Sequence, residues 1–262
     1  MKSNVLLLGP QGTGKTKSLE TLTEALADRY GDLGSVRVIS MEAGIEDVLG
    51  HIPCPLLHWH YIPPLALTWD EVTSFIKKMN VLGVKALSEA SDPNRTKYTQ
   101  FFEVFATCQR FVCDRCEEDL GCVDDWTHTN ALALDGATGL CKLAMQTLVG
   151  AKPFVSLPEY KAGQEAVMAL LNMCMPLACW FILLAHTDRE LLHETGQVAT
   201  TVHAIGQKLA PQMTKAFSEV IRTKRSGTVF TWSTDEDGTE TKTRRLPWSD
   251  KLLPTFAQFF KE

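Results

Sequence analysis

The sequence predicts a single α/β domain built on a mostly parallel β-sheet. Short apolar runs alternate with longer amphipathic segments, and the first run leads directly into a glycine-rich turn and then a helical pattern. The 262 residues suffice for one sizeable core. Hydrophobic residues make up 45% and charged residues 22%, values typical of a globular protein, which excludes a disordered or fibrous chain.

Five apolar runs are the candidate strands of this sheet. They are short and rich in Val, Ile and Leu, as expected for strands buried on both faces of a parallel sheet. Helical periodicity in residues 15–30, 69–87 and 164–173 supplies the crossover helices. The strand candidates are residues 5–8, 36–40, 56–62, 131–134 and 180–185.

The pattern changes after residue 217. β-branched runs at 219–222, 228–233 and 239–246 are separated by Ser-Gly and Asp-Gly turn signals. This predicts a C-terminal antiparallel hairpin over residues 218–246. The sequence contains no evident repeat or interdomain linker, so residues 1–262 are predicted to form one domain.

Charge and hydropathy limit where the protein acts. The net charge of −5 excludes a surface that is basic overall, so any nucleic-acid contact needs a local basic patch. The N-terminal apolar run is too short for a signal peptide, and residues 177–185 are fewer than the roughly 20 that span a membrane. We expect a cytoplasmic protein without membrane contact, whose eight cysteines are thiols or metal ligands rather than disulfides.

The glycine-rich turn is the most specific motif. It matches the phosphate-loop pattern and has the expected strand before it and helix after it. Backbone N–H groups of such a loop surround phosphates, the lysine reaches the β- and γ-phosphates, and the hydroxyl residue ligates Mg²⁺. The sequence therefore predicts binding of ATP with Mg²⁺. The motif is Gly9, Pro10, Gln11, Gly12, Thr13, Gly14, Lys15 and Thr16.

Two carboxylates follow predicted strands. Asp135 ends the 131–134 run in the form of a Walker B element and would join Thr16 in holding Mg²⁺. The next residue is Gly136 rather than a second carboxylate, so the catalytic base must lie elsewhere. Glu42 follows the 36–40 strand at the same edge of the sheet and could polarise the attacking water. The alternative is a solvated loop glutamate.

His186 follows the 180–185 strand at the predicted catalytic edge. It could donate a hydrogen bond to the γ-phosphate and transmit its loss to the next loop. The alternative is a histidine that only caps the strand.

The order of these elements resembles a RecA/Rad-type recombinase core without an accessory N-terminal domain. Segments 206–209, 217–220, 230–234 and 246–248 look like the tail of phage-encoded AAA-type ATP-binding proteins, among them the Sak-type single-strand annealing ATPases. The resemblance implies a RecA-like P-loop ATPase that self-associates as a ring or filament on single-stranded DNA during phage recombination.

The same resemblance implies where DNA would bind, because RecA-like proteins hold it in the loops after the fourth and fifth strands. Here these would be residues 139–164 and 191–213, the second continuing into a basic segment that has few stacking aromatics. The alternative is a solvated charged face. The implied DNA contacts are Lys208, Lys215, Arg222, Lys224 and Arg225. Arg244 and Arg245, with Lys224 and Arg225, are candidate fingers toward a neighbouring subunit.

Four cysteines precede the Walker B strand, within a predicted insertion over residues 108–128. Cys113 and Cys116 form a Cys-x2-Cys knuckle that supplies half of a tetrahedral zinc site. Cys122, with Cys108 or His128, could supply the rest. The alternative is a core position for Cys108 and free thiols for the others.

A second function uses the same ATP site with another partner. An ATP-switched phage assembly or DNA-packaging factor would couple hydrolysis to protein contacts. A small-molecule kinase fits less well, because the hairpin tail is long and no lid segment is evident.

Overall fold

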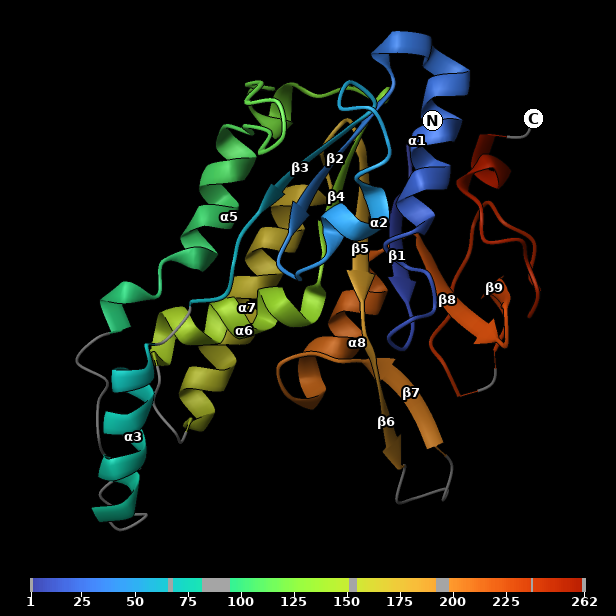
Figure 1. The fold of residues 1–262 in the computed structure, drawn as a ribbon. Coiled ribbons are helices and arrows are strands. Elements are labelled where there is room, and N and C mark those ends of the chain that lie inside the picture. Colours follow the sequence, from blue (N-terminus) through green and yellow to red (C-terminus); the bar gives the residue numbers. More distant parts are fainter. Residues whose placement is uncertain are drawn as a thin grey trace.

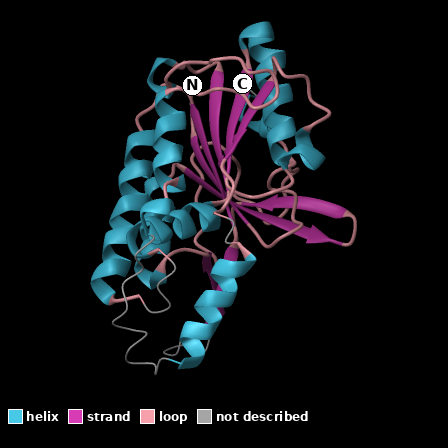
Figure 2. Ribbon diagram, turned by 60° about the vertical axis from the view of Figure 1, so that its left-hand side comes forward, coloured by secondary structure: helices cyan, strands magenta, loops and turns pink. Residues whose placement is uncertain are grey.

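The structure is a computed structural model and describes residues 2–65, 68–81, 95–150, 155–191, 198–236 and 238–260. Seven strands form one sheet in the order β3-β2-β4-β5-β1-β8-β9, with helices on both faces (Figures 1 and 2). The predicted class is therefore confirmed: an α/β fold with a mostly parallel sheet and a C-terminal antiparallel hairpin.

All five predicted strands are present, and two strands of the predicted hairpin join them in the sheet. The first half of the predicted hairpin, β8, pairs in parallel with β1, and β9 pairs antiparallel with β8 at the edge of the sheet. The strands of this sheet are β1 (Asn4–Leu8), β2 (Ser35–Ser40), β3 (Leu57–Tyr61), β4 (Asn130–Asp135), β5 (Trp180–Ala185), β8 (Glu219–Ser226) and β9 (Val229–Ser233).

The third run of the predicted hairpin is not a strand. Residues 239–246 make isolated bridges, among them Val220 with Lys242. β1 occupies one edge of β8, and β9 occupies the other from Arg222 onward, so only the start of β8 remains open to this segment. The prediction was wrong because turn signals do not reveal which edges are already paired.

Helices cover the sheet in two layers. Leu7 and Val5 face α1, α2 and the C-terminal turn, whereas Leu6 and Leu8 belong to the core shared with the helices from α5 to α8. The prediction for residues 69–87 matches α3 as far as Val81, and the remainder lies outside the described residues. The helices are α1 (Ser18–Tyr30), α2 (Ile45–Leu49), α3 (Trp69–Val81), α5 (Gln100–Gln109), α6 (Ala137–Val149), α7 (Leu157–Cys174) and α8 (Gly206–Ala216), with a short 3-10 turn at Phe256–Phe260.

The two segments predicted as loops are largely regular structure. Residues 139–164 belong mostly to α6 and α7, because Leu140, Leu143 and Ala144 bury one helical face in the core. The 191–213 segment contains the last residue of β6 (Thr187–Leu191), all of β7 (Val198–Val202), which pairs with β6 in a two-stranded sheet, and most of α8. Residues 192–197 lie outside the described residues. Across the described parts of the chain, none of the helices combines the length and apolar character needed to cross a bilayer.

Candidate nucleotide and catalytic site

The phosphate loop connects β1 to α1 at the carboxyl edge of the sheet. Gly12 and Gly14 have φ angles of +75° and +83°, a region that favours glycine. A Cβ at Gly9 would lie 2.0 Å from Thr223 Oγ1 and 2.6 Å from Thr13 Oγ1, so only glycine fits between them. Thr223 on β8 also donates to the carbonyl of Leu8, which ties the loop to the neighbouring strand.

Lys15 is buried at the centre of the loop. Its Nζ lies 2.8 Å from the Gly9 carbonyl and 2.9 Å from the Pro10 carbonyl, so it donates to the loop's own backbone. Burial holds the pKa of the Lys15 ammonium below its ordinary value, although the carboxylates of Glu42 and Asp135 oppose this. The cation is therefore poorly solvated and poised for an anionic partner.

His186 joins Lys15 to Glu42. Its Nδ1 lies 3.3 Å from Lys15 Nζ, and its Nε2 lies 3.1 Å from Glu42 Oε2. Since an ammonium has only donors, Nδ1 accepts from Lys15, and the neutral ring donates its Nε2 proton to Glu42. The hydrogen bond from His186 lowers the pKa of Glu42 despite its partial burial. The two residues predicted as base and sensor are thus in direct contact.

Thr16 and Asp135 meet at the end of β4. Thr16 Oγ1 donates to Asp135 Oδ2 across 3.1 Å. Burial, together with the nearby charge of Glu42, raises the pKa of Asp135 to about 6. A carboxylate that is costly to ionise in the free protein gains most from a cation beside it.

Gly136 explains how Glu42 reaches the end of the neighbouring strand. A Cβ on Gly136 would lie 2.8 Å from Glu42 Cγ and 3.1 Å from its Oε1, and the φ of Gly136 is +109°. The Glu42 side chain therefore lies over Gly136, the position directly after Asp135 at which the sequence has no second carboxylate. The Met41 amide donates to the Asp135 carbonyl and holds the two strand ends together.

The loop residues fit a Mg²⁺-nucleotide. The phosphate loop leaves no room for a Cβ at Gly9, and the buried ammonium of Lys15 lies at its centre. Thr16 and Asp135 offer the oxygen ligands that Mg²⁺ prefers. Lys15, Thr16, Glu42, Asp135 and His186 are brought together at one edge, from four separate segments of the chain.

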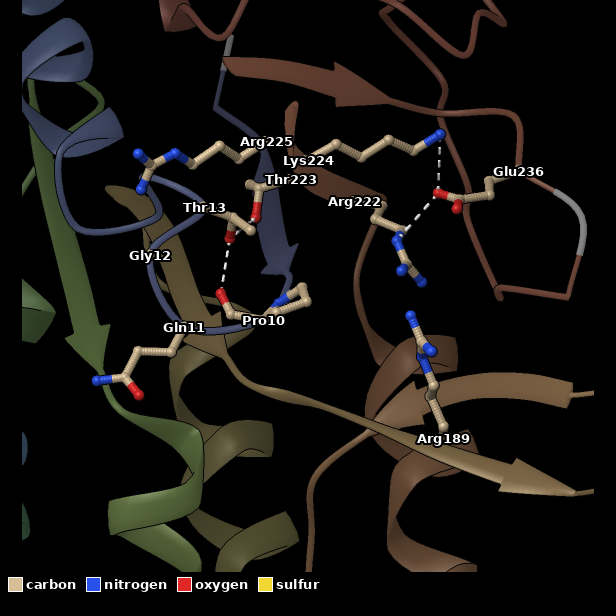
Figure 3. Close-up of a pocket in the computed structure, with 10 residues that line it drawn as sticks. All are labelled: Pro10, Gln11, Gly12, Thr13, Arg189, Arg222, Thr223, Lys224, Arg225 and Glu236. Atoms are coloured by element: carbon tan, nitrogen blue, oxygen red, sulfur yellow. Dashed lines mark hydrogen bonds and ion pairs between the residues drawn. The ribbon is translucent and has the colours of Figure 1, made fainter. Parts of the chain in front are cut away.

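A basic pocket of about 470 Å³ opens on the β8 side of the loop. Figure 3 shows Arg189 and Arg222 pointing toward each other, while Glu236 pairs with Arg222 and Lys224. Arg225 extends beside Gly12 (Figure 3). Arg189 was not among the predicted site residues, because its position on β6 depends on how the second sheet packs.

The predicted DNA contacts divide into two groups. Lys208 and Lys215 are exposed on α8, whereas Arg222, Lys224 and Arg225 lie on β8 beside the phosphate loop. The sequence had suggested one continuous basic loop. The five residues instead lie on a helix and on a strand.

The candidate fingers lie elsewhere. Arg245 donates to the Phe259 carbonyl and to Ser3 Oγ, so its guanidinium is engaged within its own chain. Arg244 is exposed next to it. Ser3 precedes β1, which places these residues at the sheet edge opposite the phosphate loop.

The structure brings together two of the four cysteines predicted as zinc ligands. Cys113 and Cys116 lie together, but with Cys54 and His58 rather than with Cys108 and Cys122. Cys108 is on α5 and contacts Cys174, Cys122 precedes a 3-10 turn, and His128 packs edge-on against Tyr30. The Cys54-x3-His58 spacing was a signal in the sequence, although its distance from the knuckle concealed the link.

Comparisons with known proteins give little further guidance. Neither a protein-family model nor a curated protein matches the chain. Among solved structures the chain is similar to a KaiC-like protein from the hyperthermophilic archaeon Pyrococcus horikoshii OT3. The match has 13% sequence identity and a TM-score of 0.39, and it covers 95% of this chain and 82% of that chain.

Proposed function

We propose that this protein is a RecA-like ATPase that binds Mg²⁺-ATP and hydrolyses it. The observation that carries the proposal is the hydrogen-bonded chain from Lys15 through His186 to Glu42. It connects the cation of the phosphate loop to a carboxylate at the neighbouring strand end. A simple nucleotide-binding loop would not require this carboxylate.

The proposed roles follow from the contacts. Loop N–H groups and Lys15 would bind the β- and γ-phosphates, and Thr16 and Asp135 would hold a Mg²⁺ ion, whose charge would offset that of the phosphates. Glu42 orients the attacking water and accepts its proton, because its lowered pKa keeps it ionised at neutral pH. His186 positions Glu42 and loses its Lys15 contact when the ammonium turns to the phosphates.

A second hollow, of about 230 Å³, fits the purine base. Phe230 and Pro254 line it together with Thr13, Gly14 and the first turn of α1. The Phe230 ring would lie 3.2 Å from a Cβ at Gly14, so it borders the loop directly. An aromatic ring and a proline offer the flat apolar contact on which a base stacks.

We further propose single-stranded DNA as the coupled partner, in phage recombination or single-strand annealing. The support is positional. β6 begins at the residue after His186, and the His203 amide at the end of the β6–β7 hairpin donates to the His186 carbonyl. A strand bound along α8 and this hairpin would therefore act on the residue that touches both Lys15 and Glu42.

The test is the ATPase rate with and without single-stranded DNA, over a range of salt concentrations. We expect DNA to stimulate hydrolysis, with binding that falls with salt at a logarithmic slope of about −2 to −4 for three to five phosphate contacts. Hydrolysis that is indifferent to DNA, without binding at low salt, would favour a protein partner in an assembly or packaging role. Lack of any hydrolysis with Mg²⁺-ATP would overturn the ATPase itself.

A further inference from the structure

A compact group of three thiols and one imidazole lies outside the nucleotide site. Cys54 precedes β3 and His58 lies within it, while Cys113 and Cys116 belong to a short hairpin that follows α5. The three Sγ atoms and a His58 ring nitrogen all lie within 4.8 Å of one another. The two halves of the group are 59 residues apart in sequence at Cys54 and Cys113.

The spacing of these atoms matches the edges of a metal-centred tetrahedron. With Zn–S bonds of about 2.3 Å and Zn–N bonds of about 2.0 Å, the S–S edges are about 3.8 Å and the S–N edges about 3.5 Å. Cys54 Sγ lies 3.6 Å from Cys113 Sγ, and His58 Nδ1 lies 3.7 Å from Sγ of both Cys54 and Cys116. Three measured edges therefore agree with the tetrahedron to within about 0.2 Å.

The fourth measured edge is shorter. Sγ of Cys54 and Sγ of Cys116 are 2.9 Å apart, so these thiols must separate by about 0.9 Å to reach the tetrahedral edge. Cys116 is exposed and Cys54 is half-buried, which leaves both side chains room to move. A disulfide between them would need S–S contact at about 2.04 Å and is the alternative that the test must distinguish.

The local backbone is already shaped around a thiolate. The Arg115 amide donates to Cys113 Sγ across 3.4 Å, a contact that orients the sulfur and stabilises negative charge on it. Glu117, directly after the knuckle, is the one non-glycine residue with positive φ, at 59°, among the described residues. This left-handed residue turns the chain back so that the Glu118 carbonyl accepts from the Cys113 amide.

We propose that Cys54, His58, Cys113 and Cys116 bind one structural Zn²⁺ ion. Thiolates and imidazole select Zn²⁺ over the hard cations Mg²⁺ and Ca²⁺, and four protein ligands leave no open coordination position for catalysis. The ion fastens the hairpin across the outer edge of β3, where the Asp114 amide donates to the Trp59 carbonyl and the Tyr61 amide donates to Asp114 Oδ2. The hairpin thereby covers an edge strand that would otherwise present free backbone groups.

The experiment measures metal content by elemental analysis of protein purified under reducing conditions without chelator. We expect about one zinc per chain in the natural protein. The matched control is the Cys108→Ser/Cys122→Ser double variant, which removes two neighbouring cysteines outside the group and should keep its zinc. Cys54→Ser and Cys113→Ser should each lose at least tenfold in zinc affinity, measured by chelator competition.

A second measurement keeps the proposal falsifiable if a serine variant fails to fold. Co²⁺ added to metal-free natural protein should give the intense visible absorption of a tetrahedral thiolate site. His58→Cys should retain binding and shift that absorption toward the spectrum of four thiolates. The proposal is overturned if the reduced natural protein takes up neither metal. It is equally overturned if the double control variant loses zinc while Cys54→Ser keeps it, or if mass spectrometry finds a native Cys54–Cys116 disulfide.

Discussion

The chemistry of the candidate site depends on a few atoms whose protonation the surroundings control. Lys15 donates to His186, and His186 in turn donates to Glu42, so neutral histidine and charged carboxylate are mutually consistent. Gly136 leaves room for Glu42 to lie beside Asp135. Substitutions at two single residues, Lys15 and Glu42, should separate nucleotide binding from hydrolysis.

Lys15→Ala should abolish nucleotide binding, because it removes the buried ammonium that faces the phosphates. Titration with a fluorescent ATP analogue measures this, and circular dichroism checks the fold. Lys161→Ala is the control, since Lys161 is exposed on α7 and lines neither pocket beside the phosphate loop, so this variant should bind ATP normally. ATP affinity unchanged in Lys15→Ala would refute the phosphate-loop assignment.

Glu42→Gln should keep ATP binding but lower the hydrolysis rate by ~10²- to 10⁴-fold, since the amide keeps the shape and cannot accept a proton from water. Single-turnover hydrolysis at saturating Mg²⁺-ATP is the measurement. Glu46→Gln, at an exposed position on α2, should hydrolyse at the natural rate. If Glu42→Gln stays within a few-fold of the natural rate, another residue is the base.

At the scale of elements, the β6–β7 hairpin and α8 connect the site to the surface. β6 begins directly after His186, and His203 Nδ1 pairs with Asp188 Oδ2 across 2.6 Å at the base of the hairpin. Lys208 and Lys215 are exposed on the helix that follows. Of these elements, β6 is joined directly to His186, and the His203 amide before α8 donates to the His186 carbonyl.

Lys208→Ala and Lys215→Ala should each weaken the salt dependence of single-stranded DNA binding, reducing the slope by about 0.7 per lost phosphate contact. Fluorescence anisotropy at several salt concentrations measures the slope, and ATP affinity should not change. Lys77→Ala on α3 provides a control at an exposed lysine of another element. Slopes equal to that of the natural protein in both α8 variants would exclude this helix from the DNA footprint.

At the scale of the whole molecule, the buried carboxylate at the candidate site costs stability in the nucleotide-free protein. Burial raises the pKa of Asp135 from an ordinary 3.8 to about 6, so the folded state binds this proton more tightly than the unfolded state. The stability contributed by the protonated form is fully present below pH 4 and is lost as the pH rises through about 6. Each tenfold change in the proton affinity of Asp135 corresponds to about 1.4 kcal/mol, so the free energy of unfolding falls by an amount on the order of 3 kcal/mol.

Asp135→Asn should therefore raise the free energy of unfolding at pH 8 without Mg²⁺ or nucleotide, and the gain should shrink toward pH 5. Urea denaturation at both pH values measures the difference. Asp28→Asn, an exposed position on α1, should change stability little at either pH. A less stable Asp135→Asn protein at pH 8 would show that the ionised carboxylate stabilises the fold rather than straining it.

Local patterns in the sequence were sufficient to predict the five strands β1 to β5, the phosphate loop and three side chains at strand ends. These depend on hydrophobic periodicity, on the backbone freedom of glycine, and on the rule that parallel strands end at one edge. The three candidate residues, Glu42, Asp135 and His186, do meet at that edge.

Contacts between distant segments were decided only by the tertiary structure. The pairing of β8 with β1 placed Arg222, Lys224 and Arg225 beside the phosphate loop rather than on a DNA loop. Packing of the short hairpin after α5 on β3 brought Cys113 and Cys116 to Cys54 and His58. The cysteines that are nearer in the sequence, Cys108 and Cys122, are not part of this group. Sequence spacing measures distance along the chain, whereas metal sites and pockets depend on which edges and faces remain unpaired once the sheet has formed.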